Sequence, residues 1–322
     1  MKRGLLRAIL AAIMLGLLLY MLGPRTTADT EIVFDAAAIG DDPAAYLAQR
    51  EAQVPGIRDG LQKEIVWAYP NSRARTPLAI VYVHGFSASK GEVRPLPDLV
   101  AAELGANLFY TRFTGHGQDG AALGAATASQ WIEDFAEALA IGRAIGERVV
   151  IMATSTGGGL AVWAATRPDL MENIAAMVLV SPNLRIQDTG SSLLTGPWGR
   201  EIAGLVAGAE QRADPENELH GRFWTLTYPT GVAAEVAAIA ELGREAPVEQ
   251  AKVPALFIIS DADPVVDPKT TREIAARWGG PHRLEVVTDA GNDHVLAGDA
   301  RSPATTQRLA EQSVAFIRAE AR

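Results

Sequence analysis

The chain has 322 residues, of which 48% are hydrophobic, and it contains no cysteine. This length suits one large domain with an insertion, and the lack of cysteine excludes disulfides and thiolate metal sites. The formal net charge is -9, and the basic residues of segment 1–28 have no acidic neighbours within it, so the body that follows is more acidic still. An acidic body argues against nucleic acid and anionic lipid surfaces as partners.

The chain begins with a positively charged segment that is followed by an apolar run. Lys2, Arg3 and Arg7 precede the uninterrupted apolar residues 8–22. As a helix this run would extend roughly 22 Å, between a signal-peptide core and the ~30 Å of a full membrane span. Three interpretations are open: an uncleaved anchor, a signal peptide cleaved after Ala28, and a buried globular helix. The first two export the body, which in a bacterial-type cell means the periplasm or the cell envelope.

Beyond this segment, strand-like and helix-like patterns alternate. A short helix is expected near 43–53. The expected strands cover residues 63–68, 78–83, 107–113, 149–154, 176–180, 255–260 and 283–288. The expected helices of the same region cover residues 96–104, 129–144, 157–166, 268–278 and 304–320. This alternation predicts an α/β fold, with a mostly parallel central sheet and helices on both faces.

The stretch 184–250 interrupts the alternation. It contains several glycines and helix-like segments at 200–212 and 232–242. We therefore expect an N-terminal signal peptide or membrane anchor (1–28), a core made of 29–183 and 251–322, and an insertion formed by 184–250.

Ser155 occupies the most informative position in the chain. It lies in Ala153-Thr154-Ser155-Thr156-Gly157, between a buried strand and a helix rich in small residues. A serine on such a sharp strand-to-helix turn presents its hydroxyl at the edge of the sheet, and the helix start offers free N–H groups to a negative charge. The usual pattern, G-x-S-x-G, has glycine at the position of Ala153. We interpret Ser155 as a candidate nucleophile, which needs a base and an acid that orients the base.

Two downstream segments supply candidates for these roles, in the chain order serine, aspartate, histidine. Asp261, Asp263 and Asp267 follow one expected strand, and His294 follows the next through a Gly-Asn turn. In open α/β sheets, ligands bind beyond the carboxyl ends of the strands, so these side chains can meet the serine. Asp261 and Asp267 also suit turn formation and helix capping, since Asp267-Pro268 begins a helix well.

Four motifs together resemble the α/β-hydrolase superfamily, specifically its monoacylglycerol-lipase-like and carboxylesterase-like serine hydrolases. They cover roughly residues 60–320 and are His84-Gly85-Phe86, Gly115-His116-Gly117, the Ser155 turn, and the Asp263 and His294 segments. The resemblance implies Ser155 as the nucleophile, His294 as the base and then the acid, and Asp263 as the orienting carboxylate. It also implies an oxyanion hole formed by the backbone N–H groups of Phe86 and Thr156, and it implies no cofactor and no metal.

The other histidines are expected to be structural. His84 and His116 belong to family motifs that shape loops, whereas His220 and His282 belong to no motif. Trp131 matches a tryptophan that packs the following helix onto the sheet in this family.

Residues 115–120 fit the dinucleotide pattern G-x-G-x-x-G literally. That fingerprint must open directly into a helix in the first βα unit, and here a segment rich in alanine and glycine, 121–128, is expected to intervene. We therefore predict no dinucleotide site.

The resemblance predicts a serine hydrolase that cleaves carboxylic esters through an acyl-enzyme, with a small ester or a lipid as substrate. It places the insertion over the active site as a cap, where aromatic residues either line an acyl pocket or pack the cap onto the core; they are Trp198, Phe223, Trp224 and Tyr228. A peptidase, a thioesterase or an acyltransferase would use the same triad. The altered turn at Ala153 keeps open a membrane-tethered binding protein with a relic hydrolase fold.

Overall fold

A computed structural model of the protein describes residues 2–188 and 190–321. Its centre is a seven-stranded sheet in the order β1-β3-β2-β4-β5-β8-β9, in which every neighbouring pair is parallel except β1 and β3. The strands are β1 (Glu64–Val66), β2 (Thr76–Val83), β3 (Asn107–Tyr110), β4 (Gly146–Thr154), β5 (Ile174–Val180), β8 (Ala255–Ile259) and β9 (His282–Val286). The predicted α/β class with a mostly parallel sheet is confirmed.

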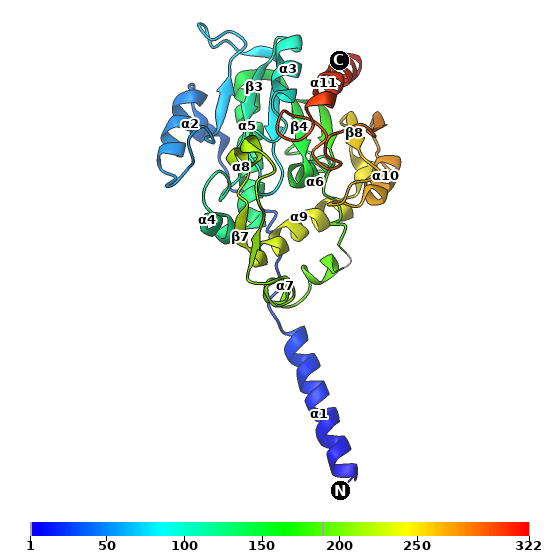
Figure 1. Ribbon diagram of the computed structural model, residues 1–322. Helices are drawn as coiled ribbons and strands as arrows, with labels where there is room; N and C mark the ends of the chain where they lie inside the picture. The colour runs from blue at the N-terminus through cyan, green and yellow to red at the C-terminus, as the bar shows by residue number, and fades with distance from the viewer. Residues whose placement is uncertain (1, 189, 322) are drawn as a thin grey trace.

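Helices cover both faces of the sheet (Figure 1). One face carries α5 (Ala128–Ile145), α6 (Ser155–Ala164) and α10 (Pro268–Ala276), and the other carries α3 (Leu96–Leu104) and α11 (Pro303–Glu320). Successive residues of β4 point to opposite faces: Val149 and Ile151 belong to the first core, whereas Val150 and Met152 belong to the second. Burial on both sides explains why the central strands are continuously apolar.

The insertion 184–250 lies between β5 and β8 and mixes helices with a small ribbon. Strands β6 (Glu210–Arg212) and β7 (Thr227–Pro229) pair antiparallel. The helices of this region are α7 (Gly199–Ala207), α8 (Glu218–Phe223) and α9 (Ala233–Glu245), with 3-10 turns η2 (Ser191–Leu193), η3 (Thr230–Val232) and η4 (Val248–Gln250). Helix α9 packs on α6 and thereby seats the insertion on the core.

Two sequence expectations are corrected here. The helix predicted over 200–212 ends at Ala207, because Gly208 has a φ of +85° and the following residues pair with β7 instead. The segment 121–128, expected to separate residues 115–120 from the next helix, itself contains most of α4 (Gly120–Ala125), which the Asp119 side chain caps by accepting the N–H of Ala122 at 2.8 Å. This short helix packs against β7 of the insertion.

The N-terminal helix α1 (Lys2–Met21) projects away from the domain beneath α7 (Figure 1), and none of its apolar stretch is buried. The interpretation as a buried globular helix is therefore wrong. The chain then runs along α5, where Ser129 Oγ accepts the N–H of Asp29 at 2.8 Å. It continues through η1 (Ala36–Ile39) and α2 (Pro43–Ala52) to the first strand of the sheet.

Candidate active site

Ser155 lies at the junction of β4 and α6, at the carboxyl edge of the sheet. Strand β4 ends at Thr154, and Ser155 has a φ of +51°, a left-handed conformation that costs a non-glycine residue about 1–2 kcal/mol. Backbone strain of this kind is typical of a residue that the surrounding structure holds in place for function. Ala153 is buried in β4 and pairs with Val83 and Leu179, so the sheet accepts alanine where the usual pattern has glycine.

Glycines behind the turn allow α6 to approach its neighbours closely. A Cβ on Gly157 would lie 2.5 Å from the carbonyl oxygen of Val83, and a Cβ on Gly158 would lie 2.9 Å from Pro182 Cα. Real Cβ atoms do not approach this closely, so both positions require glycine. The small residues of the motif therefore set the position of the helix whose first turn surrounds Ser155.

The structure brings three predicted residues into one chain of contacts. His294 Nε2 lies 3.0 Å from Ser155 Oγ, and His294 Nδ1 lies 2.8 Å from Asp263 Oδ2. The other Asp263 oxygen accepts the N–H groups of Val265 and Val266 at 2.8 and 3.0 Å, which fixes the orientation of the carboxylate. This order of contacts is the one that a nucleophile, a base and an orienting acid require.

His294 is held by its own turn. The Asn292 side chain accepts the N–H of His294 at 2.9 Å and that of Val295 at 2.8 Å, and Ser302 Oγ accepts the N–H of Asn292 at 3.0 Å. The Gly-Asn turn seen in the sequence therefore places the imidazole at the end of β9, opposite the serine.

The rival carboxylates lie outside this chain of contacts. Asp261 is an exposed partner of Arg272, with oxygen–nitrogen distances of 2.7 and 2.8 Å. Asp267 caps α10 by accepting the N–H of Lys269 at 3.0 Å and the hydroxyl of Thr270 at 2.8 Å. Helix capping at Asp267 agrees with its alternative interpretation, whereas Asp261 makes a surface ion pair instead of shaping the turn.

His84 and His116 support the loop beside Ser155. His84 Nε2 accepts the N–H of Phe113, and His116 Nε2 accepts the N–H of Ser87, both at 3.1 Å. A ring nitrogen that accepts a backbone N–H carries no proton, so both rings are neutral. Burial lowers the pKa of His84 to about 4 and that of His116 well below its usual range. Their contacts are those of loop-shaping residues.

Two backbone N–H groups lie in segments next to Ser155, since Thr156 follows it and a Cβ on Gly85, the neighbour of Phe86, would lie 3.0 Å from Ser155 Cβ. Thr156 belongs to the first turn of α6, where N–H groups have no partner within the helix. The N–H groups that flank Phe86 are both used, that of Gly85 by Glu92 and that of Ser87 by His116, while the described residues offer no acceptor for Phe86 itself. These two N–H groups are available to a ligand.

Glu92 is a buried acid next to the site that the sequence reasoning missed. It is 2% exposed, and its Oε2 accepts the Gly85 N–H and the Tyr82 hydroxyl, each at 2.8 Å. Burial raises the pKa of Glu92. In the sequence, the only feature that relates Glu92 to the site is its position six residues after Phe86. An acidic residue at such a position cannot be told from an ordinary surface residue.

The site is largely buried, and the insertion contacts the loop beside it. Ser155 is only 6% exposed and His294 9%. Tyr228 of β7 packs edge-on against Phe86 with ring centroids 5.1 Å apart, and the N–H of Thr225 donates to the Ser87 carbonyl at 2.8 Å. The insertion is thus joined directly to the loop that carries Phe86.

The remaining aromatic residues of the insertion pack elsewhere. The Phe223 ring occupies the space next to Gly91, and Trp224 packs edge-on against His220 at 4.9 Å. Trp198 contacts the end of α1. Packing therefore accounts for these three, whereas Tyr228 packs against the Phe86 ring.

The other residues singled out in the sequence have structural contacts. Trp131 of α5 is buried, donates to the Thr114 carbonyl at 3.0 Å and packs against Phe113. His220 Nδ1 accepts the N–H of Glu216, just before α8, at 3.2 Å, and His282 is an exposed residue at the start of β9.

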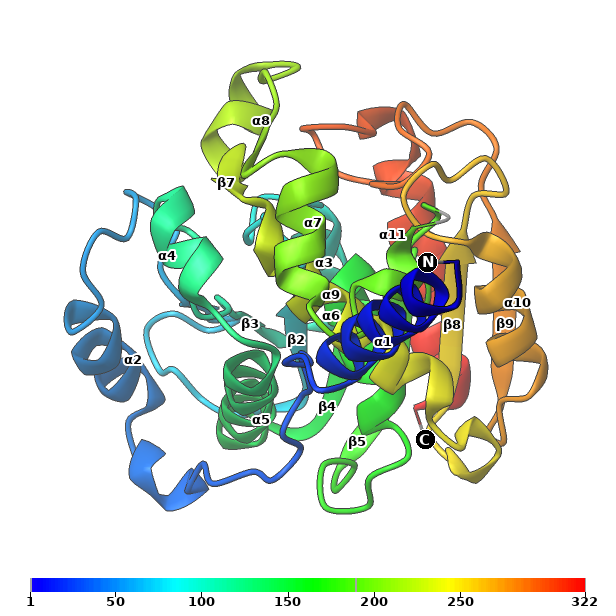
Figure 2. The ribbon, with the colours of Figure 1, turned by 90° about the horizontal axis from the view of Figure 1, so that it is seen from below.

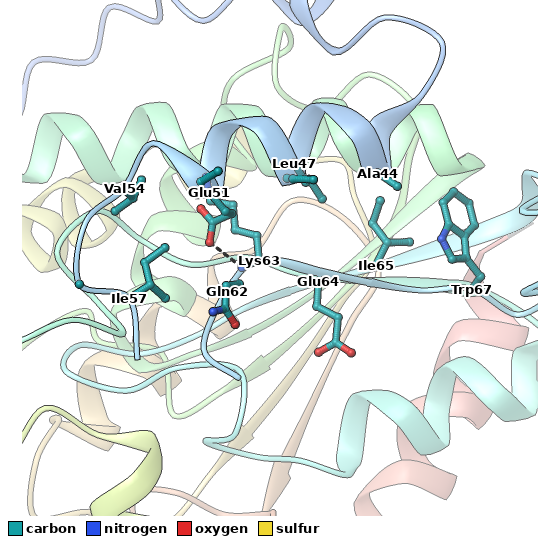
Figure 3. Close-up of a pocket in the computed structure, with 13 residues that line it drawn as sticks. Ala44, Leu47, Glu51, Val54, Ile57, Gln62, Lys63, Glu64, Ile65 and Trp67 are labelled. Carbon is teal, nitrogen blue, oxygen red and sulfur yellow. Dashed lines mark hydrogen bonds between the residues drawn. The ribbon is translucent and has the colours of Figure 1, made fainter. Parts of the chain in front are cut away.

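A separate cavity of about 590 Å³ lies between α2 and β1, at the far edge of the sheet (Figure 3). Ala44, Leu47 and Ile65 form its apolar part, and the N–H of Lys63 donates to the Glu51 carboxylate at 2.8 Å. It contains none of the residues that contact Ser155. Among residues 2–188 and 190–321, no cluster of acidic and histidine side chains suits a metal ion.

The sheet order, the serine turn and the inserted cap define a class of α/β proteins with a covered site at the carboxyl edge of the sheet. The model of the alpha/beta hydrolase family matches residues 80–304, and the chain belongs to this family. No curated protein matches the chain.

Several solved structures share the fold. A structure reported with LipS and LipT, two metagenome-derived lipolytic enzymes, is 24% identical with a TM-score of 0.67, covering 82% of this chain and all of its own. A soluble variant of monoglyceride lipase from Saccharomyces cerevisiae is 14% identical with a TM-score of 0.61, covering 84% and 96%. The monoacylglycerol lipase of Paleococcus ferrophilus is 17% identical with a TM-score of 0.55, covering 80% and 98%.

Proposed function

We propose that the protein is a serine hydrolase that cleaves carboxylic esters through an acyl-enzyme. The observation that carries this proposal is the unbroken chain of contacts from Ser155 Oγ through both nitrogens of His294 to Asp263. A hydroxyl is a weak nucleophile until a neighbouring base removes its proton, and this base is itself held by a carboxylate. The fold shared with lipolytic enzymes and monoglyceride lipases supports the same class of reaction.

In the proposed reaction, Nε2 of His294 takes the proton from Ser155 Oγ as the oxygen attacks the ester carbonyl. Asp263 accepts the N–H at Nδ1 and stabilises the imidazolium that forms. The N–H groups of Phe86 and Thr156 stabilise the oxyanion, with each donor contributing about 3 kcal/mol at the transition state. His294 then protonates the leaving alcohol, and a water molecule activated by the same histidine releases the acid.

We propose a monoacylglycerol or another ester with a short-to-medium acyl chain as the substrate. The support is the covered position of Ser155 and the aromatic contact of Phe86 with Tyr228, which give the surroundings of the carbonyl an apolar character. A largely buried site favours a substrate that loses little hydration when it enters.

We also propose that α1 is an uncleaved membrane anchor with the catalytic domain outside the cytoplasm. Among the described residues, α1 is the helix that is long and apolar enough to cross a membrane, and positive charges precede it. Basic residues on one side of a span favour the cytoplasmic side.

The proposed chemistry is tested by labelling the full chain in detergent with a fluorophosphonate probe. We expect wild type and Asp261→Asn to be labelled, Ser155→Ala to be unlabelled, and His294→Ala to be labelled far more slowly, since a serine without its base loses most of its reactivity. Hydrolysis of a short soluble ester is measured on the same samples. A folded wild type that neither reacts with the probe nor hydrolyses the ester would favour the relic binding protein.

A further inference from the structure

The cap carries an exposed apolar surface that no other part of the described chain covers. Outside α1, four large hydrophobic side chains cluster here: Leu193 is 47% exposed, Trp198 39%, Leu205 85% and Val206 80%. We call this set the apolar cap face. Large apolar side chains grouped on a surface mark a place where a protein meets another apolar phase.

The exposed apolar side chains of α7 lie in its last turn, and Trp198 directly precedes the helix. Trp198 and Leu205 are seven residues apart, about two turns, and so lie on the same side, whereas Ala203 is buried against the rest of the cap. A helix at the surface of a domain in water normally turns polar residues outward. Here Leu205 and Val206, in the last turn of α7, are the most exposed side chains of the apolar cap face, so this end of α7 suits contact with an apolar environment.

The apolar cap face is attached directly to the end of α1. The N–H of Trp198 donates to the Pro24 carbonyl at 2.7 Å, and its indole N–H donates to the Leu19 carbonyl at 3.2 Å. A Cβ on Gly23 would collide with the Trp198 indole, so the ring lies flat against the chain at this point. Seen from below in Figure 2, α1 lies beside α7 and in front of part of α9.

These contacts tie the depth of α7 to the depth of α1. A helix of 20 residues is about 30 Å long, the thickness of a hydrocarbon core. If α1 spans a bilayer, Tyr20 and Trp198 lie at its outer boundary, where tyrosine and tryptophan concentrate. The segment after α1 is fixed to the domain, because Glu133 of α5 accepts the N–H groups of Val33 and Phe34 at 2.8 and 2.9 Å. This restricts how far α1 can move relative to the domain.

We propose that the apolar cap face docks into the interfacial region of the bilayer that α1 crosses, and so holds the covered catalytic site against the membrane surface. The inference rests on the anchoring put forward under Proposed function. The occupant is lipid because the face is continuous with the membrane helix through the contacts of Trp198. Apolar burial drives the docking, since the acidic body favours no attraction to anionic lipids. A site held in this position receives esters that partition into the bilayer.

The position of the face is tested with nitroxide labels. The chain has no cysteine, so a single introduced cysteine is labelled uniquely. The full-length Leu205→Cys variant is reconstituted in phosphatidylcholine vesicles, and Ala315→Cys, an exposed position on α11 at the opposite end of the domain, is the control. We expect the label at 205 to collide preferentially with dissolved oxygen and the label at 315 with a water-soluble nickel chelate.

Three results would overturn the docking. A label at 205 that collides with the nickel chelate as often as the control lies in water. A label at 205 that is shielded from both reagents is covered by protein, a second copy or a partner, instead of lipid. Loss of residues 1–28 from the mature protein, read from its intact mass, would also overturn it.

The consequence for activity is tested with the pair Leu205→Glu and Val206→Glu in one chain. We expect hydrolysis of a monoacyl ester embedded in phosphatidylcholine vesicles to fall about tenfold, because charged side chains resist insertion at the interface, while hydrolysis of a short soluble ester is unchanged. Ala315→Glu should change neither rate. Equal loss of activity on both substrates would count against docking. If wild type hydrolyses neither substrate, the hydrolase assignment is wrong, but the nitroxide labels still report the position of the cap.

Discussion

The backbone N–H of Gly85 donates to the buried carboxyl group of Glu92 at 2.8 Å, directly before Phe86 in the loop beside Ser155. The same oxygen of Glu92 accepts the Tyr82 hydroxyl, also at 2.8 Å, and the Tyr82 hydroxyl lies 3.2 Å from Thr154 Oγ1. Glu92 therefore connects the loop after β2 to the end of β4. If the Phe86 N–H stabilises an oxyanion as proposed, we expect Glu92 to position it.

Substitutions at Glu92 separate this role from its charge. Glu92→Gln keeps an acceptor for the Gly85 N–H, whereas Glu92→Ala leaves that N–H buried without a partner, at a cost of about 1–3 kcal/mol. We expect kcat for a soluble ester to fall at least about tenfold in Glu92→Ala and to change little in Glu92→Gln, with KM similar in both, since a displaced loop loses oxyanion stabilisation. Equal losses in the two variants would assign the effect to the carboxylate charge instead.

The choice of Asp263 over its neighbours gives a second prediction. In Asp263→Asn the amide would donate to His294 Nδ1 and favour the wrong tautomer of the ring, which reduces kcat by about 10⁴-fold in serine proteases with this arrangement. We expect a loss of at least about 10³-fold here. Asp261→Asn removes only an exposed ion pair with Arg272 and should leave kcat within about twofold of wild type. Steady-state rates on a soluble ester check both variants, and a larger loss at Asp261 would contradict the assignment.

Buried His84 gives a prediction about pH. Its pKa is about 4 in the folded protein because of burial, against an ordinary value of 6.5. Between pH 6.5 and 4 the unfolded chain therefore binds a proton at His84 that the folded protein does not bind. The free energy of unfolding should fall over this range, with about 3 kcal/mol of the decline due to His84. Urea unfolding at several pH values should show a shallower decline in His84→Gln, even though the substitution lowers stability at neutral pH.

His116 keeps part of the decline in that variant, because burial lowers its pKa in the same direction. The combined variant His84→Gln, His116→Gln should therefore be the least sensitive to acid. Parallel curves for wild type and His84→Gln would mean that His84 is protonated to the same extent in both states.

The sequence predicted the core of the fold and the positions of its polar residues because both depend on local patterns. Apolar runs located the buried strands, and the carboxyl ends of parallel strands meet at one edge, so Ser155, Asp263 and His294 were expected together. The structure places them within hydrogen-bonding distance. Capping by Asp267 was likewise readable from the proline that follows it.

The features that the sequence did not predict depend on contacts between distant residues. Strand β6 continues a run that looks helical, and it becomes a strand only by pairing with β7 beyond α8. Glu92 looks like a surface charge until Tyr82 and Gly85 surround it. The contact of Trp198 with Leu19 joins segments at opposite ends of the first two hundred residues, and no periodicity reports such a pairing.

The glycines behind Ser155 give the last prediction. In Gly157→Ala the added methyl group would lie 2.5 Å from the carbonyl oxygen of Val83, at the end of the strand that leads into the His84 loop. Neither backbone can yield without moving the oxyanion donors, so we expect a loss of about 1–3 kcal/mol in the free energy of unfolding together with a large fall in kcat. Gly204→Ala is the matched control, because a Cβ there meets nothing within 4 Å and alanine favours the helix by up to about 1 kcal/mol. The free energy of unfolding, measured with urea, and the rate of ester hydrolysis should therefore both be lower in Gly157→Ala than in Gly204→Ala. A Gly157→Ala enzyme as stable and active as wild type would show that the turn is less tightly packed than these distances require.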